Sequence, residues 1–215
     1  MTGLRADAVR NRKRVLEAAR AAHAQSGTAL CMHEVARRAG VGVGTVYRHF
    51  PSRQALIDAI AHPFFERGLA LAHAVAETEP QGERFARFLR GFAEALASHG
   101  VPGHCMWDAP AARPVRTELR GLVASFVDSG RRSGTLRADL TAEDAFALLW
   151  TIAMLIDASD GRRPEIWRRH VELALDGLRV GAPARLEAPP FALGQWDGFV
   201  HETAARAGSG EADEL

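Results

Sequence analysis

Two short segments on either side of Gly40 constrain the fold of this chain most. The apolar pattern predicts one helix over Met32 to Ala39 and a second over Val43 to Phe50. Gly40 provides a residue that tolerates positive φ in a tight turn, and Ala36 is small enough for the two helices to cross closely. Three valines are spaced to fill the core between them: Val35, Val41 and Val46. The pattern therefore predicts a helix-turn-helix, whose second helix enters the major groove of DNA.

The rest of the chain also has the periodicity of helices. Apolar stripes predict helices at about residues 8–25, 52–77, 85–96, 115–134, 141–158 and 164–180. Ser52 is placed to cap the second of these, and Pro63 is expected to kink or restart it. Thr141 and Asp144 have nearly the spacing of a capping box. No segment alternates with the period of a strand, so the predicted fold class is all-α.

Composition limits the class of protein. The 215 residues are 47% hydrophobic and 25% charged, which suits a soluble globular chain of one or two domains. No run approaches the roughly 18 apolar residues that a membrane span needs. The arginine-rich N-terminus lacks the apolar stretch of a secretory signal, and two cysteines are too few for a disulfide scaffold. A cytoplasmic location is expected.

Charge is distributed unevenly along the chain. Residues 1–60 carry ten basic and four acidic side chains, whereas the remaining residues carry 17 basic and 22 acidic ones. A basic head on a mildly acidic body predicts a polyanionic partner for the head. A solvated arginine-rich surface without a partner accounts for the charge alone equally well.

The segment from Gly40 to Leu56, G-V-G-V-G-T-V-Y-R-H-F-P-S-R-Q-A-L, resembles the DNA-binding signature of TetR-type repressors. The stretches 12–20, 134–140 and 167–179 are also similar to segments of that family. The resemblance implies a helix-turn-helix head over 8–62 and a helical effector-binding and dimerisation domain over 63–205. Residues 206–215 are expected to be a disordered acidic tail.

The resemblance also implies which residues contact DNA: Arg37, Gly44, Thr45, Tyr47, Arg48, His49 and Arg53. Gly44 would let the recognition helix approach the bases, and Thr45 would point to a base edge or a phosphate. Arg53, at the start of the next helix, would clamp a phosphate. The sequence departs from the family at Cys31, where Ser or Thr usually caps the first helix of the motif, so a weaker cap or a lost phosphate contact is expected.

Large apolar side chains in the second half are candidates for an effector pocket: Phe64, Phe88, Phe92, Met106, Trp107, Phe126, Trp150 and Met154. For each of these, a place in the hydrophobic core is the alternative. Residues 164–180 carry two apolar stripes, one of which can face the core and the other a partner. The dimer-interface candidates are Leu155, Trp167, Val171, Leu173 and Leu178, in a four-helix bundle formed by two copies of the chain.

The resemblance implies a sequence-specific homodimeric repressor that a small apolar or amphipathic effector releases from a palindromic operator. An activator or an effector-independent DNA binder is the alternative, and a helical ligand-binding protein with a vestigial head is a further one. No motif of a hydrolase, a phosphate-binding loop or a metalloprotease occurs, so neither an enzyme nor a cofactor is expected. His99, His104 and Cys105 invite a metal site, but their spacing does not favour one, and none is predicted.

Overall fold

The computed structural model describes residues 2–26, 31–99, 109–159 and 163–181, together with Leu186 and Ala188. The described elements are α1 (Thr2–Ser26), α2 (Met32–Ala39), α3 (Val43–His49), α4 (Arg53–Thr78), α5 (Arg84–His99), the 3₁₀ turn η1 (Pro110–Ala112), α7 (Arg113–Arg132), α8 (Ala142–Ala158) and α9 (Pro164–Gly177). Within these ranges the only extended pairing is one antiparallel bridge between Leu136 and Arg179. The predicted all-α fold is confirmed.

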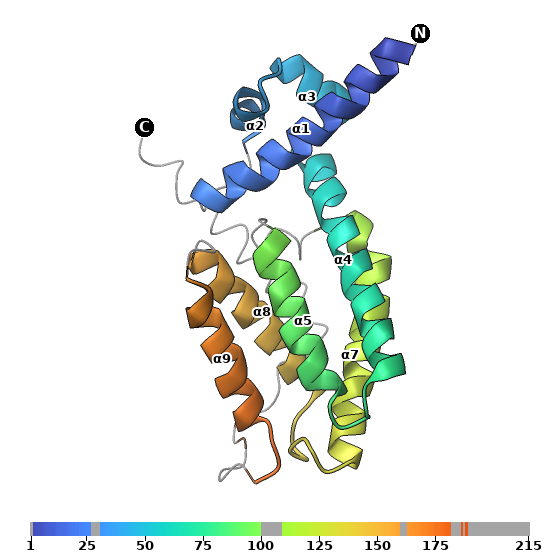
Figure 1. The fold of residues 1–215 in the computed structure, drawn as a ribbon, viewed down its shortest axis with the longest axis vertical. Coiled ribbons are helices and arrows are strands. Elements are labelled where there is room, and N and C mark those ends of the chain that lie inside the picture. The colour runs from blue at the N-terminus through green and yellow to red at the C-terminus, as the bar shows by residue number, and fades with distance from the viewer. Residues whose placement is uncertain are drawn as a thin grey trace.

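Helices α1, α2 and α3 form a head at one end of the molecule (Figure 1). Its core consists of small apolar side chains that are fully buried, including Val15 and Ala19 of α1, Val35 of α2 and Val46 of α3. Helix α1 ends close to the expected residue but begins earlier, at Thr2.

Helix α4 joins the head to the body of the molecule (Figure 1). Its first turn is capped as predicted, because the Ser52 hydroxyl accepts a hydrogen bond from the N–H of Ala55 at 3.1 Å. The helix does not restart at Pro63 but runs through it to Thr78. Proline removes one helical hydrogen bond, and the burial of Phe64 and Phe65 beside it stabilises the continuous helix. The expected domain boundary at residues 62–63 therefore lies inside one helix.

In the body, α5 and α7 pack against α4, α8 packs against α5 and α7, and α9 packs against α8 and α5. Helices α4 and α7 lie side by side, and α9 lies on the outside against α8 and α5 (Figure 1). Helix α9 begins at Pro164 as predicted and ends at Gly177, three residues before the expected Val180. Within the described part of the chain, no helix is both long enough and apolar enough to cross a membrane.

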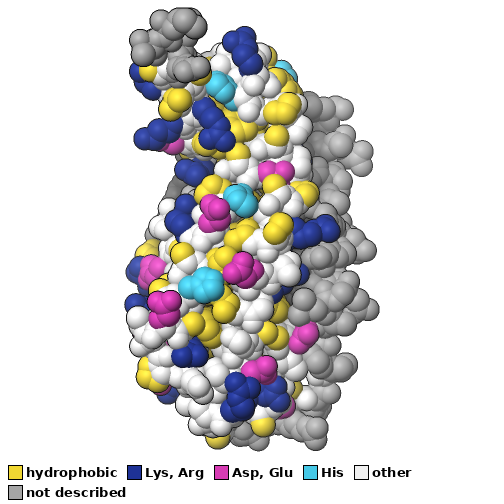
Figure 2. All heavy atoms as spheres, turned by 90° about the vertical axis from the view of Figure 1, so that its right-hand side faces the viewer, with side chains coloured by type: hydrophobic (Ala, Val, Ile, Leu, Met, Phe, Trp, Pro, Cys, Tyr) yellow, Lys and Arg dark blue, Asp and Glu magenta, His cyan; other side chains and the backbone are white. Residues whose placement is uncertain are grey.

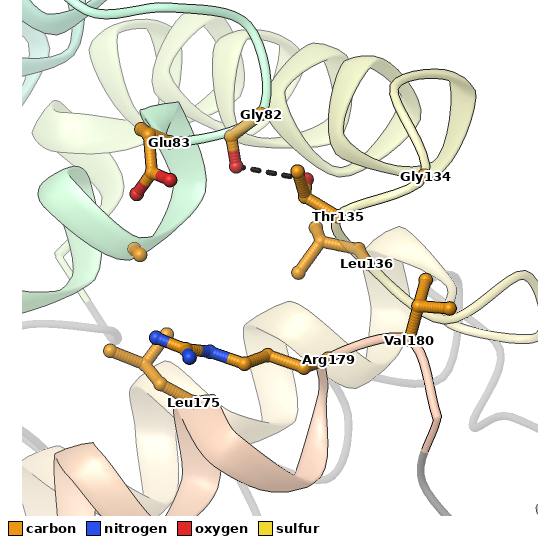
Figure 3. A pocket seen from close by; sticks show the side chains of 9 residues that line it. Gly82, Glu83, Gly134, Thr135, Leu136, Leu175, Arg179 and Val180 are labelled. Atoms are coloured by element: carbon orange, nitrogen blue, oxygen red, sulfur yellow. Dashed lines mark hydrogen bonds between the residues drawn. The ribbon is translucent and has the colours of Figure 1, made fainter.

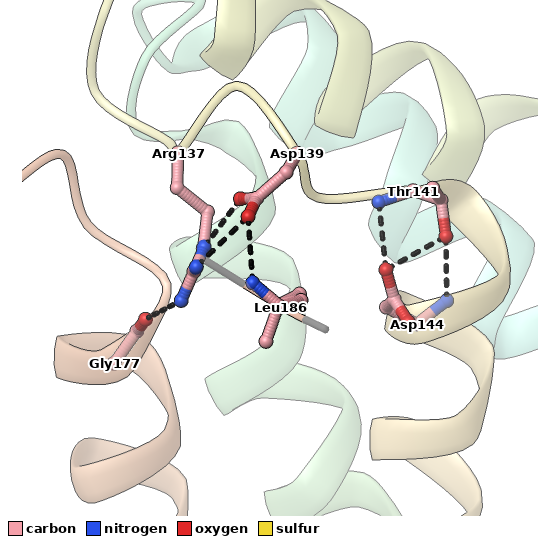
Figure 4. Close-up of polar contacts among 6 residues, drawn as sticks. All are labelled: Arg137, Asp139, Thr141, Asp144, Gly177 and Leu186. Atoms are coloured by element: carbon pink, nitrogen blue, oxygen red, sulfur yellow. Dashed lines mark hydrogen bonds and ion pairs between the residues drawn. The ribbon is translucent and has the colours of Figure 1, made fainter. Parts of the chain in front are cut away.

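Helix α8 begins with the capping box that the sequence indicated. The Thr141 hydroxyl accepts a hydrogen bond from the N–H of Asp144 at 3.2 Å, and the Asp144 carboxylate accepts one from the N–H of Thr141 at 2.9 Å (Figure 4). Two otherwise unpaired N–H groups are thus satisfied at the start of the helix. This cap fixes where the turn after α7 ends and α8 begins.

Candidate nucleic-acid interface

The turn between α2 and α3 requires the glycine at its centre. Gly40 has φ +61°, in the left-handed region, and a Cβ built there would lie 2.7 Å from Nη2 of Arg14. The N–H of Gly40 donates to the carbonyl of Arg37, and the N–H of Val41 donates to that of Ala36. These two bonds form a Schellman motif, which ends α2 and sets the direction of α3.

Contacts from α1 hold the two helices of the motif in place. The guanidinium of Arg12 lies 5.2 Å from the ring centroid of Phe50, at the end of α3. In the last turn of α2, Arg38 Nη1 donates to the carbonyl of Ala21 at 3.1 Å. The helix-turn-helix is thereby fixed to α1 at the end of each of its two helices.

Helix α3 buries only one of its seven residues, Val46, and presents the remaining residues partly or fully to solvent. Tyr47 is 45% exposed and Arg48 is exposed, whereas Thr45 and His49 are half-buried. Gly44 is exposed, and no described atom lies within 4 Å of a Cβ built on it. The fold therefore does not require glycine at position 44, and α3 offers a polar surface that a groove of DNA can accommodate.

Glu34 holds two arginines of α2. Arg37 donates to both of its carboxylate oxygens, from Nε at 2.7 Å and from Nη2 at 2.6 Å, and Arg38 Nε donates at 2.5 Å. Hydrogen bonds from Arg37 and then Arg38 lower the pKa of Glu34 from 4.5 to about 2, so the carboxyl is ionised at neutral pH. Arg37, an expected DNA contact, is exposed but already bonded to an acid.

Cys31 occupies the N-cap of α2, as expected. Its backbone is extended, with φ −90° and ψ 121°, but its side chain forms no capping hydrogen bond within the described part of the chain. Glu34, three residues later, is at the position that completes a capping box, yet its carboxylate binds the two arginines. The start of α2 therefore lacks both side-chain caps of that motif.

Basic side chains gather on the head. Figure 2 shows Lys and Arg at the upper end of the molecule, while basic and acidic side chains are intermixed over the body below. Arg53 is exposed at the first position of α4, immediately beside the recognition motif. The basic side chains predicted for the head thus lie together at one end of the fold, which suits a polyanionic partner.

Most of the expected effector-pocket residues lie in the core of the body. Phe64, Phe88, Phe92 and Phe126 are each at most 2% exposed. Their rings are in contact, with centroids 5.2 Å apart for Phe64 and Phe92 and 6.0 Å apart for Phe88 and Phe126. Trp150 and Met154 are half-buried against this core. Met106 and Trp107, like His104 and Cys105, lie outside the described residues, as does the side chain of His99.

The two stripes of α9 face in different directions. Trp167 and Val171, two of the interface candidates, are 2% exposed and pack into the core of the chain itself. Leu173 is 59% exposed and Ile166 is 40% exposed, on the opposite side of the helix. The remaining interface candidates, Leu155 and Leu178, are half-buried.

Sequence reasoning missed the role of Glu34. The spacing of Glu34 from Arg37 and Arg38, three and four residues, is the spacing at which side chains meet on a helix. That signal was present in the sequence. The bond from Arg38 to Ala21 and the contact of Arg12 with Phe50 join distant segments, and no local pattern indicates them.

Comparisons with known proteins agree with this geometry. Residues 15–60 match the model of "bacterial regulatory proteins, tetR family", and residues 82–180 match that of the "transcriptional regulator SbtR-like, C-terminal domain". A TetR transcription regulatory protein from Mycobacterium vanbaalenii is 36% identical, with 82% of this chain and 99% of that chain covered and a TM-score of 0.46.

Two further solved structures extend the comparison. A TetR transcriptional regulator from Streptomyces coelicolor is 29% identical over 78% of this chain and 98% of that one, with a TM-score of 0.50. A TetR family regulator from Thermus thermophilus is 18% identical over 77% and 99%, with a TM-score of 0.60, and shows the shared fold. No curated protein is similar enough to this chain to match.

Proposed function

The chain belongs to the TetR family of DNA-binding transcriptional regulators, and from that premise we propose that it is a homodimeric repressor released from a palindromic operator by a small molecule. The exposed polar surface of α3 carries this proposal. Members of the family act by binding DNA, and α3 is held by the α2–α3 turn so that Tyr47 and Arg48 are exposed and not packed in the head's own core.

The candidate DNA-contacting residues have distinct parts in this function. Gly44 lets the backbone of α3 approach the base edges, and Thr45 and Arg48 contact bases or phosphates. Tyr47 and His49 donate to phosphates, and Arg53 binds a phosphate at the start of α4. Contacts to the DNA backbone fix the position of the head, and the few side chains that face the groove provide sequence preference.

The exposed stripe of α9 supports a dimer. Leu173 and Ile166 are large apolar side chains left in solvent, while the opposite side of the same helix is buried. A second copy of the chain that covers this stripe with its own would form an isologous interface from α8 and α9. Two heads related by that symmetry would read two half-sites about one helical turn apart.

Release by an effector is supported by how α4 joins the two parts. The N–H of Ala111 in η1 donates to the carboxylate of Asp58 at 3.4 Å, and Gln54 donates to the same oxygen at 3.3 Å. Asp58 lies on the part of α4 next to the head, while Phe64 and Phe65 of the same helix lie in the body. A ligand that favours one position of α4 would therefore change the spacing of the two heads.

Selection of bound duplexes from a random DNA pool tests this function. We expect a near-palindromic winner whose affinity falls steeply with salt, because several phosphates are contacted. Compounds that release the protein from this duplex then identify the effector. Failure of every duplex to be enriched would contradict sequence-specific binding, and tight binding that no metabolite releases would favour an effector-independent regulator.

A further inference from the structure

Three segments that are far apart in the sequence line a half-open cavity of about 290 Å³ at the end of the body away from the head. It lies between the α4–α5 turn, the turn after α7 and the end of α9 (Figure 3). The side chains used below are Glu83, Ala86, Thr135, Leu136, Leu175 and Arg179. A cavity of this size is at the lower end of the range for small-molecule sites.

Hydrogen bonds between the segments fix the walls of this cavity. The Thr135 hydroxyl donates to the carbonyl of Gly82 at 3.0 Å, which joins the turn after α7 to the α4–α5 turn (Figure 3). The N–H of Val180 donates to the carbonyl of Thr135 at 3.3 Å, and that of Arg137 donates to the carbonyl of Leu178 at 2.9 Å. The end of α9 is therefore fastened to the same turn.

Hydrogen bonds of the Arg137 side chain strengthen the connection between the end of α9 and the turn after α7. Arg137 donates to both carboxylate oxygens of Asp139, at 2.5 and 2.9 Å, and to the carbonyl of Gly177 at 3.4 Å (Figure 4). Asp139 also accepts from the N–H of Leu186 at 3.1 Å. These bonds hold the end of α9 in place, so the cavity is a feature of the fold and not a gap between loose loops.

Two charged pairs join α5 to α9. Arg168 donates to both oxygens of Glu94 at 2.8 and 3.0 Å, and Arg90 donates to both oxygens of Glu172 at 2.6 and 2.8 Å. The second pair lies four residues earlier than the first on α5 and four residues later on α9.

A further seven residues in the same directions lead past the ends of both helices, to Glu83 just before α5 and to Arg179 just after α9. These two side chains have opposite charges, but they do not pair with each other. Both side chains are exposed and form no hydrogen bond or ion pair within the described part of the chain, but each acts electrostatically on a closed pair: Glu83 helps to raise the pKa of Arg90, and Arg179 helps to lower the pKa of Glu172. The cavity lies between these two side chains (Figure 3).

The floor of the cavity is apolar while its rim is charged. Leu136 is 6% exposed and Leu175 is 3% exposed, and Ala86 completes the apolar side. A molecule complementary to this surface has an ammonium group near Glu83 and a carboxylate near Arg179, which can bind a carboxylate through two parallel hydrogen bonds. Its remaining part is a short hydrocarbon chain that covers the leucines.

We propose that this distal cavity binds a small zwitterion with an aliphatic side chain, of the chemical class of an aliphatic α-amino acid. The ammonium group binds Glu83, the carboxylate binds Arg179, and the side chain lies on Leu136 and Leu175. The site is separate from the aromatic core of the body and from the DNA-binding head.

L-Leucine is the probe that tests the proposal, with the full-length protein labelled with ¹⁵N. We expect millimolar L-leucine to shift amide signals of the cavity residues, among them Thr135 and Val180. Affinity measured by calorimetry should rise from glycine through alanine and valine to leucine, by about fourfold for each methylene that becomes buried. The analogues 4-methylpentanoate, without the ammonium, and 3-methylbutylamine, without the carboxylate, should each bind about tenfold more weakly.

Two variants, each of which replaces one charged side chain by a neutral glutamine, test which charges bind the ligand. Arg179→Gln and Glu83→Gln should each weaken L-leucine about tenfold, whereas Glu83→Gln should leave the binding of 4-methylpentanoate unchanged. Arg132→Gln removes another exposed arginine, at the end of α7 and outside the cavity, and serves as the matched control. DNA binding by the same samples shows that they are folded, independently of the outcome at the cavity.

Two results would overturn the proposal. One is the absence of any amide shift at the cavity residues with L-leucine and its shorter homologues. The other is binding of L-leucine that neither Arg179→Gln nor Glu83→Gln weakens, since the charged rim would then have no part in it.

Discussion

Arg37 and Glu34 form a two-fold hydrogen-bonded ion pair on the surface of the head, with 2.7 Å between Nε and Oε2 and 2.6 Å between Nη2 and Oε1. A phosphate that binds Arg37 must either displace the Glu34 carboxylate or bind with that negative charge beside it. The pair therefore limits how strongly the head attracts DNA of any sequence.

Replacement of Glu34 by glutamine should tighten binding to every duplex. One acid less beside two arginines strengthens the attraction to phosphates, and the slope of log affinity against log salt should become steeper by about 0.9. Fluorescence anisotropy over a salt series measures this slope. Glu94→Gln is the matched control, because Glu94 accepts the same two-fold pair from Arg168 in the body. An unchanged slope in Glu34→Gln would show that Arg37 makes no phosphate contact.

Replacement of Gly44 by alanine separates folding from DNA binding. A methyl group there meets no described atom within 4 Å, so the variant should fold and gain up to about 1 kcal/mol of stability from helix propensity. If α3 approaches the bases closely at this point, affinity for the operator should nevertheless fall at least tenfold. Gly121→Ala, also exposed and in open space on α7, should be stabilised without a change in DNA affinity. Equal operator affinity for wild type and Gly44→Ala would remove Gly44 from the contact surface.

Serine at position 31 should stabilise the head. Cys31 has the extended backbone of an N-cap but forms no capping bond in the described structure, and a serine hydroxyl can accept from the N–H of Glu34. We expect Cys31→Ser to raise the free energy of unfolding by about 1 kcal/mol in urea denaturation. Cys31→Ala, which removes the thiol without adding a cap, should bring no such gain. Equal stability of the serine and alanine variants would mean that the N–H groups at the start of α2 are satisfied in another way.

A charge on the exposed stripe of α9 should break the dimer. Leu173→Glu places a carboxylate in the proposed interface, where its desolvation is unfavourable, and the mass from light scattering should halve. Val9→Glu changes another exposed apolar residue, on α1 of the head, and should leave the mass unchanged. A dimer that persists in Leu173→Glu would place the interface elsewhere.

Local signals in the sequence were sufficient for the helix-turn-helix and for the ends of several helices. Gly40, Ser52 and the pair Thr141 and Asp144 each act through bonds within a few residues of themselves, so their sequence patterns predict their structures directly. The bounds of α2 were predicted to the residue for the same reason.

Contacts between distant segments could not be predicted in this way. Periodicity found two apolar stripes on α9 but could not decide between them, and the structure buries the stripe that contains the larger side chain, Trp167. Pro63 indicated a break, yet the packing of Phe64 and Phe65 keeps α4 continuous. Glu83 and Arg179 are almost a hundred residues apart, and bonds of the turn after α7 to the α4–α5 turn and to the end of α9 bring them to one cavity.

The central claim, a symmetric dimer that reads two half-sites, is tested most directly by changing their spacing. The measurement compares the affinity of the protein for its selected duplex and for the same duplex with five base pairs inserted between the half-sites. Five base pairs turn one half-site by about half a helical turn, so two heads in a fixed dimer can no longer engage both. We predict a loss of affinity of at least a hundredfold at constant salt. Equal affinity for the two duplexes would contradict the account, because the heads would then bind DNA independently of one another.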